Sequence, residues 1–298
     1  MGETQRVEHV VLHVGAHRTG TGSFQGFLAQ NQQLLVEAGI AARFPGRDIS
    51  GEGNLRLKLP DPAVFKAKEA LEPHINGVQR AIAQGPQAKT LLVCEENILG
   101  RMAPFYRGQF YSRLWRRADV LRQGLAGEVG RGPDQVVLVM RNYGDLFVSA
   151  YAQLAQIRKM PDFDQALPHL QKITRGWPVV IEALKKGLQC CDLRAVPYVD
   201  RGSNSELLGQ MIKAVPEGLV DDHQNANVSA SAEAIMALQS RFHAGETLDA
   251  DTVAAIKADH SVSAGGSKFN PLSAAQKAAF TRRYNADLKL IKVSQVKT

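Results

Sequence analysis

The first residues suited to chemistry lie in a glycine-rich segment near the start of the chain, Gly15–Ser23 (GAHRTGTGS). A β-branched run, His9–Val14, precedes this segment, and an apolar stripe of helical period follows it. Glycines let the backbone turn N–H groups inward, and a new helix adds unpaired N–H groups and a positive dipole end. Arg18 and three hydroxyl side chains add charge and donors. The order of strand, glycine loop and helix therefore predicts an anion cradle.

The spacing from Gly15 to Gly20 matches the first part of a Walker A loop, GxxxxGK[ST]. Thr21 and Gly22, however, stand where Lys and Ser or Thr would be, and the cation is Arg18 in the middle of the loop. This displacement disfavours an ordinary ATPase or kinase. A turn that merely joins a strand to a helix is the alternative that the glycines alone leave open.

Arg141 is a second candidate for anion binding. The strongest strand pattern of the chain, Val136–Met140, ends at this residue, and a helix predicted from Asp145 to about Lys159 carries Ser149 near its start. Open α/β sheets bind ligands outside the carboxyl ends of their strands. Because a guanidinium suits bidentate contact with phosphate, we expect Arg141 to bind one, with Ser149 adding a donor.

Two adjacent carboxylates follow another apolar run, Thr90–Cys94, at the same predicted edge of the sheet. Glu96 is the first candidate for a general base, if burial raises its pKa, and Glu95 is its rival. We expect one of the two to cap a helix or pair with an arginine instead. His17, inside the loop, is a third candidate, and its alternative is a structural histidine bonded to backbone.

These segments resemble the PAPS-dependent sulfotransferase family, in which PAPS is 3′-phosphoadenosine 5′-phosphosulfate. The loop from His17 to Ser23 is similar to the 5′-phosphosulfate loop, a Lys or Arg followed by Ser/Thr, Gly and Thr. Many members have Lys where this chain has Arg18, although the tyrosylprotein sulfotransferases also have Arg, and Gly22 stands where a second Thr is common. The strand that ends at Arg141 resembles the 3′-phosphate segment, with Gly144 near the position of a frequent Pro.

The resemblance covers roughly residues 9–160 and implies transfer of a sulfuryl group from PAPS to a hydroxyl or amine, releasing PAP, without a metal. It implies that Arg18 stabilises the leaving group and that Glu96, Glu95 or His17 accepts the proton. The donor-binding residues that it implies are Arg18, Thr19, Gly20, Thr21, Gly22, Ser23, Arg141 and Ser149. A late basic loop, residues 263–268, is a candidate to close over the nucleotide, and a plain surface loop is the alternative.

Alternating strands and helices predict an α/β fold: a single domain over residues 1–298, with a mainly parallel central sheet flanked by helices. The resemblance specifies a P-loop-kinase-like sulfotransferase fold. Residues 200–298 read as mainly helical, and the last helix starts at Ser273, which forms a capping box with Gln276. Further predicted elements are a helix from Phe24 that ends at Gly39, a helical stretch from about Ala63 to Gln84 interrupted at Pro73, and a strand at Leu193–Val199.

The composition is that of a globular protein: 298 residues, 44% hydrophobic and 22% charged, with a net charge of +7 that suits an anionic ligand. Three irregularly spaced cysteines predict a reducing compartment rather than a disulfide framework, and no spacing suggests zinc. No signal peptide or membrane span is evident, so we expect a cytoplasmic protein.

Two other functions stay open. The run Leu91–Glu96 imitates a Walker B strand, which fits a Mg-dependent P-loop NTPase or kinase. A non-catalytic nucleotide- or polyanion-binding protein is the third, using the arginines of residues 113–122. As partners we expect a nucleotide donor and a small-molecule or glycan acceptor but no nucleic acid; the sequence does not give the oligomeric state. Candidate acceptor linings are residues 44–62 and the aromatic side chains of 105–115, which at helical spacing are more often core.

Overall fold

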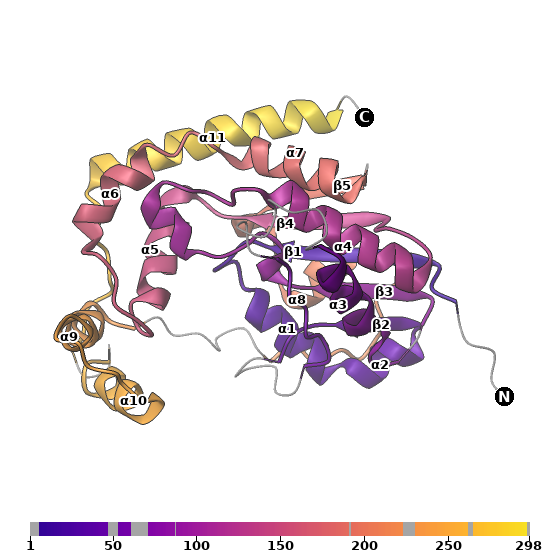
Figure 1. Cartoon of the computed structure of the whole chain (residues 1–298), viewed down its shortest axis with the longest axis horizontal. Coiled ribbons are helices and arrows are strands. Elements are labelled where there is room, and N and C mark those ends of the chain that lie inside the picture. Colours follow the sequence, from indigo (N-terminus) through magenta and orange to yellow (C-terminus); the bar gives the residue numbers. More distant parts are fainter. Residues whose placement is uncertain are drawn as a thin grey trace. The chain divides into compact units, whose positions relative to one another are not determined.

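The computed structural model (Figure 1) describes residues 6–46, 53–60, 71–86, 88–190, 192–222, 230–261 and 265–296. Its described residues form one sheet of five parallel strands in the order β2-β3-β1-β4-β5. The strands are β1 (His9–Gly15), β2 (Ile40–Arg43), β3 (Thr90–Cys94), β4 (Gln135–Met140) and β5 (Asp192–Pro197). The predicted α/β class with a mainly parallel central sheet flanked by helices is confirmed.

The chain divides into two compact units. The first holds the sheet and comprises the described parts of Met1–Arg101, Tyr111–Arg141 and Trp177–Ala226. Its helices are α1 (Thr21–Gln30), α2 (Gln32–Glu37), α3 (Glu72–Ala83), α4 (Leu114–Val129), α7 (Trp177–Leu188), α8 (Asn204–Gly209) and the 3₁₀ turns η3 (Glu96–Ile98) and η5 (Tyr198–Asp200).

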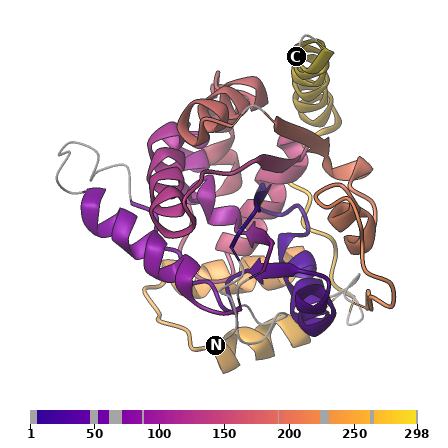
Figure 2. The same cartoon turned by 90° about the vertical axis from the view of Figure 1, so that its right-hand side faces the viewer.

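Helices cover both faces of the sheet in the first unit. Alternate strand residues such as Val11, Leu92 and Val137 form a core cluster with apolar side chains of α1, α2 and α8. On the other face α3 packs against α4, and α4 against α7. Figure 2 shows the indigo helices α1 and α2 and the violet helix α3 on opposite sides of the strands. This two-sided cover is what right-handed connections between parallel strands produce.

The strand order places a ligand-binding crevice at one point of the sheet. After β1 the chain turns toward β2, at one side of the sheet, whereas after β4 it continues to β5, at the other side. The connections of these neighbouring strands thus run in opposite directions. Ligands of open α/β sheets bind outside the carboxyl ends of strands at such a point. The segments after β1 and β4 contain the two arginines that the sequence singled out.

The second unit comprises Met102–Phe110, Asn142–Gly176 and the described part of Asn227–Thr298. It is helical in its described residues: η4 (Ala103–Arg107), α5 (Tyr143–Leu154), α6 (Phe163–Gln171), α9 (Ala232–His243), α10 (Ala250–Asp259) and α11 (Ala274–Val296). The predicted capping box is confirmed, because Ser273 N donates to Gln276 Oε1 at 2.8 Å and Gln276 N donates to Ser273 Oγ at 3.3 Å. The single domain over residues 1–298 stays a prediction.

Two local predictions were wrong. The helix expected from Phe24 to Gly39 breaks at Asn31, whose side chain donates to Phe27 O and Val220 O instead of continuing the helix. The helix predicted from Asp145 to about Lys159 ends at Leu154, and Ile157 beyond it is 68% exposed. Pro73 lies in the first turn of α3, where its missing N–H is tolerated, and the predicted helical stretch before residue 71 lies outside the described residues. None of the described helices is long and apolar enough to cross a bilayer.

Candidate functional site

The predicted anion loop begins where β1 ends and is fixed to the neighbouring strand. Ala16 N donates to Val139 O of β4 at 2.9 Å, so the loop starts in register with the sheet. Thr19 Oγ1 then donates to Ala16 O at 2.5 Å and closes the turn. Arg18 and Gly20 both have left-handed backbones, with φ of 64° and 79°. Gly20 adopts this conformation without steric cost, but for Arg18 it is rare and typical of functional turns.

Gly15 is needed at the base of the loop because no side chain would fit there. A Cβ built on Gly15 would lie 2.1 Å from Thr21 Oγ1 and 3.1 Å from Thr19 Oγ1. The loop therefore folds back over its own first residue, and its two threonines are buried. Helix α1 begins directly after, at Thr21, and its first turn presents N–H groups toward the loop.

The three hydroxyl groups of the loop differ in their hydrogen bonds. The hydroxyl of Thr19, predicted as a ligand donor, donates a hydrogen bond to Ala16 O within the loop. Ser23 Oγ accepts a hydrogen bond from Asn204 Nδ2 at 3.2 Å. Thr21 Oγ1 is buried and has no hydrogen-bond partner among the described residues. Thr19 thus helps to hold the turn, and the roles of Thr19, Thr21, Gly22 and Ser23 in ligand binding stay predictions.

Arg18 carries a partly buried positive charge among other charged groups. Burial lowers the pKa of its guanidinium, and the nearby charge of Arg141 lowers it further. Glu96 and Tyr198 act in the opposite direction. Since an arginine remains protonated in proteins, these influences mean that the Arg18 cation is stabilised less here than it would be in water. A bound anion would restore that stabilisation.

Arg141 lies against the same loop. Its Nη1 donates to the carbonyl oxygen of Arg18, and its guanidinium carbon lies 5.1 Å from the centre of the Tyr198 ring. The carbonyl oxygen of Arg141 accepts a hydrogen bond of 3.1 Å from Nε1 of Trp177, a fully buried side chain. The two arginines that are 123 positions apart in the sequence are therefore neighbours at the carboxyl edge of the sheet.

His17 of the loop packs against the aromatic ring of Tyr111. His17 is 4% exposed, and its Nδ1 lies 3.2 Å from the hydroxyl of Tyr111. The two rings stack with their centres 5.9 Å apart, and Tyr111 in turn contacts Trp177. Burial raises the pKa of the Tyr111 hydroxyl, so this hydroxyl stays protonated. The imidazole of His17 is therefore buried against a side chain, and its part in proton transfer stays a prediction.

The two glutamates after β3 differ in surroundings. Glu95 is 3% exposed, and its Oε1 accepts hydrogen bonds from Asn97 N at 2.8 Å and Asn97 Nδ2 at 2.9 Å. It therefore caps η3, as expected of one member of the pair. Glu96 is half-buried and close enough to Arg18 and Tyr111 to influence the pKa of both. Of the two carboxylates, Glu96 has the more suitable position for proton transfer at the loop.

Other predicted residues lie elsewhere. Ser149 is half-buried on α5, in the second unit, and its contact with a 3′-phosphate stays a prediction. The candidate closing loop 263–268 lies partly outside the described residues, as does the excursion 44–62. The aromatic residues of 105–111 belong to the core, whereas Trp115 is 38% exposed.

The sequence analysis missed the segment that follows β5. Tyr198 stacks under Arg141, and the guanidinium of Arg201 lies against Gly20, since a Cβ on that glycine would meet Arg201 Cζ at 3.3 Å. The signal was available: Tyr198 lies at the end of the predicted strand Leu193–Val199 and Arg201 follows it, as Arg18, Glu96 and Arg141 follow their strands. In a parallel sheet every strand delivers its following residues to the same edge.

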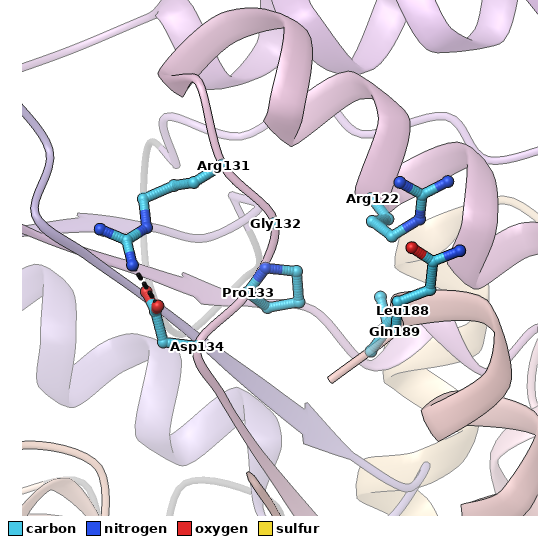
Figure 3. Close-up of a pocket in the computed structure, with 7 residues that line it drawn as sticks. All are labelled: Arg122, Arg131, Gly132, Pro133, Asp134, Leu188 and Gln189. Atoms are coloured by element: carbon cyan, nitrogen blue, oxygen red, sulfur yellow. Dashed lines mark hydrogen bonds and ion pairs between the residues drawn. The ribbon is translucent and has the colours of Figure 1, made fainter. Parts of the chain in front are cut away.

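A pocket of about 300 Å³ lies at the opposite, amino edge of the sheet, next to the turns that precede β4 and β5 (Figure 3). Arg131 and Asp134 form an ion pair there. Its other lining residues are Arg122, Gly132, Pro133, Leu188 and Gln189. This pocket is separated from the loop by the length of the strands and includes none of the predicted donor-binding or proton-accepting residues, although Arg122 is one of the arginines of the polyanion-binding alternative.

No protein-family model matches this chain, and a search of curated proteins finds no significant match. The resemblance to sulfotransferases therefore depends on the residues of the chain and on their arrangement.

Proposed function

We propose that the chain is a nucleotide-dependent transferase that binds an anionic donor at the carboxyl edge of its sheet. The single observation that carries the proposal is the contact of Arg141 with the loop, in which its guanidinium donates to the carbonyl oxygen of Arg18. Two anion-binding segments far apart in the sequence thus meet at the crevice that the strand order creates. A nucleotide with phosphate groups at two positions requires such a pair of sites.

Among nucleotide-dependent transferases, a PAPS-dependent sulfotransferase fits these residues best. The cation stands at Arg18 instead of the Walker lysine, and an all-parallel sheet suits the P-loop-kinase-like sulfotransferase fold that the resemblance implies. The loop and Arg18 would hold the 5′-phosphosulfate, while Arg141, with Ser149, would hold the 3′-phosphate. These residues fit a doubly anionic nucleotide because two guanidinium groups and a helix start face one edge.

In the proposed reaction, an acceptor oxygen or nitrogen forms a bond to sulfur while the bond from sulfur to the bridging phosphate oxygen breaks. The products are the sulfated acceptor and PAP, which keeps the electron pair of the broken bond. Arg18 and the loop N–H groups would stabilise the charge that develops on that oxygen. The acceptor proton would pass to Glu96, the half-buried carboxylate beside Arg18.

A Mg-dependent phosphoryl transferase is the competing function, because Glu95 and Glu96 follow β3 in the manner of a Walker B acid. Glu95 already accepts two hydrogen bonds from Asn97, which favours a structural use of that carboxylate. Thermal shifts of the purified protein with PAP and with ATP plus Mg²⁺ separate the two functions. We expect stabilisation by PAP that exceeds that by ATP with Mg²⁺; the reverse order would reject the sulfotransferase proposal.

The acceptor is then found by incubation with labelled PAPS and pooled acceptors, with one pool of small phenols and one of glycans. Transfer of label to either pool, lost in the Glu96→Gln variant, would support both the reaction and the base.

A further inference from the structure

We propose that Arg201, on the segment after β5, is a positioning residue that also supplies a third positive charge to the anion loop. This inference rests on the proposed binding of an anionic nucleotide by that loop. The sequence motifs of the loop and of the Arg141 segment do not include Arg201 or its neighbours.

The contact of Arg201 with the loop is made through the plane of its guanidinium. A Cβ on Gly20 would lie 3.3 Å from Cζ, 3.4 Å from Nη1 and 3.6 Å from Nε of Arg201. The guanidinium therefore covers the left-handed glycine that starts α1. A Cβ at position 20 would make the guanidinium shift by a few tenths of an ångström, so both the φ of Gly20 and this close approach favour glycine.

The far end of the guanidinium is fixed by Asn204. Arg201 Nη2 donates to Asn204 Oδ1 at 2.5 Å. The amide nitrogen of Asn204 then donates to Ser23 Oγ at 3.2 Å and to Asp221 Oδ1 at 2.6 Å. Because Asn204 is 2% exposed and bonded at both ends of its amide, it joins Arg201 rigidly to the first turn of α1. A change of loop conformation would have to move Arg201 as well.

The charge of Arg201 is only partly balanced within the described residues. Burial lowers the pKa of its guanidinium, while Tyr198, Asp221 and Cys94 raise it. Its Nε is buried and has no hydrogen-bond partner in the part of the chain that the structure describes. The charge of Arg201 also acts on His13 in β1. Burial is the first cause of the low pKa of His13, and the charge of Arg201 is the second. Together with Arg18 and Arg141, Arg201 places a third guanidinium group at this edge, which favours an anion at the loop.

Isothermal titration with PAP and with inorganic pyrophosphate tests this inference on the full chain. We expect Arg201→Gln to weaken both affinities about tenfold, the effect of one partly screened charge. Arg201→Lys, which restores the charge but not the planar guanidinium, should lie between the parent and Arg201→Gln in both affinities. The matched control is Arg131→Gln, at the opposite edge of the sheet, where another half-buried arginine lies in a loop before a strand; it should leave both affinities unchanged.

Chemical modification of the unaltered protein covers the case in which Arg201→Gln does not fold. Phenylglyoxal modifies accessible arginines, and we expect PAP to slow modification of the Arg201 peptide several-fold but not that of the Arg131 peptide. Equal affinities of the parent and Arg201→Gln would overturn the inference, as would an Arg201→Lys variant that binds as weakly as Arg201→Gln. An equal rate of modification of the Arg201 peptide with and without PAP would overturn it too. Binding of pyrophosphate but not PAP would instead reject the nucleotide proposal and leave the role of Arg201 intact.

Discussion

The two edges of the parallel sheet both carry arginines, but these arginines have different partners. At the amino edge, Arg131 donates to Asp134 and to the Glu8 carbonyl oxygen, and Arg122 pairs with Asp119 at 2.7 Å. At the carboxyl edge, Arg141 donates to a loop carbonyl and covers an aromatic ring. Each of these amino-edge guanidinium groups thus pairs with a carboxylate three residues away, whereas the carboxyl-edge groups come from three separate segments.

This difference shows how an arginine for structure is distinguished from an arginine for a ligand. A pair formed within three residues balances its own charge and holds one turn. Where cations from separate segments come together, the charge of one lowers the pKa of the other, as Arg141 does for Arg18, and a bound anion offsets this repulsion. The comparison predicts that replacement of arginines at the carboxyl edge changes function and that replacement at the amino edge does not.

Replacement of Arg18 should give the largest effect. We expect Arg18→Ala to lower the rate of sulfuryl transfer about 10²–10³-fold, the usual loss when one group that stabilises a developing negative charge is removed. Its fold should persist because the exposed part of the side chain reaches the ligand edge. Initial rates with labelled PAPS and circular dichroism check both statements. Arg131→Ala is the control, and near-normal turnover of Arg18→Ala would remove the distinction between the edges.

The pH dependence of stability should also differ between His13, toward the carboxyl end of β1, and His9, at its amino end. Burial and the charge of Arg201 lower the pKa of His13 from 6.5 to about 3, and its Nδ1 lies 3.0 Å from the thiol of Cys94. Because the folded state binds this proton more weakly than the unfolded state, His13 costs no stability above pH 6.5, and stability is lost as the pH falls from 6.5 toward 3. The loss is about 1.4 kcal/mol per pH unit, or about 2.7 kcal/mol at pH 4.5.

Urea titrations at pH 7.5 and 4.5 measure this effect as the free energy of unfolding. The difference between the two pH values should be smaller in His13→Gln than in the parent by about 2.7 kcal/mol. His9→Gln, at the exposed start of the same strand, is the control for the amino edge. If His13→Gln and the parent lost the same free energy of unfolding on acidification, the assignment of a buried, neutral imidazole to His13 would be wrong.

Much of this arrangement was predictable because strands and glycine loops leave strong local signals. The four longer strands are β-branched or apolar runs, and each was predicted within two residues at both ends. Strand β2, Ile40–Arg43, was missed because two alanines and an arginine give no such signal. Its Arg43 is 1% exposed and is tolerated in the sheet because its guanidinium donates to the carbonyl oxygens of Ile82 and Pro86. Contacts of that kind are not visible in a local pattern.

The candidate site was predictable to the extent that its residues directly follow strands. Arg18, Glu96 and Arg141 satisfy this rule and lie at one edge. The same rule covers Arg201, but it was overlooked because the turn after β5 has no glycine motif that draws attention to it. The division of the two glutamates into a cap and a partner of Arg18 depends on Asn97 and on backbone direction. Sequence patterns specify which residues reach an edge, and packing specifies which of them remain available there.

Replacement of Arg141 should have a moderate effect on binding. We expect Arg141→Ala to weaken the affinity for PAP about tenfold and to affect adenosine 5′-phosphosulfate, which lacks the 3′-phosphate, much less. Titration calorimetry with both nucleotides measures the two losses. Equal losses for the two nucleotides would show that Arg141 acts only through its hydrogen bond to the loop carbonyl. The assignment of the 3′-phosphate to Arg141 would then fail, although the site would remain at the carboxyl edge.

The smallest effect is expected at the amino edge, for Arg122→Ala. Arg122 forms an ion pair with Asp119, three residues away in the sequence, and the two side chains are 24% and 29% exposed. Such pairs contribute about 0–1 kcal/mol, so the melting temperature should fall by no more than a few degrees and the affinity for PAP should not change. Arg122 also lines the pocket of Figure 3, which makes this variant a strict test. A loss of nucleotide affinity on replacing Arg122 would place an anion site at that pocket, and positive charge would no longer distinguish the functional edge from the structural one.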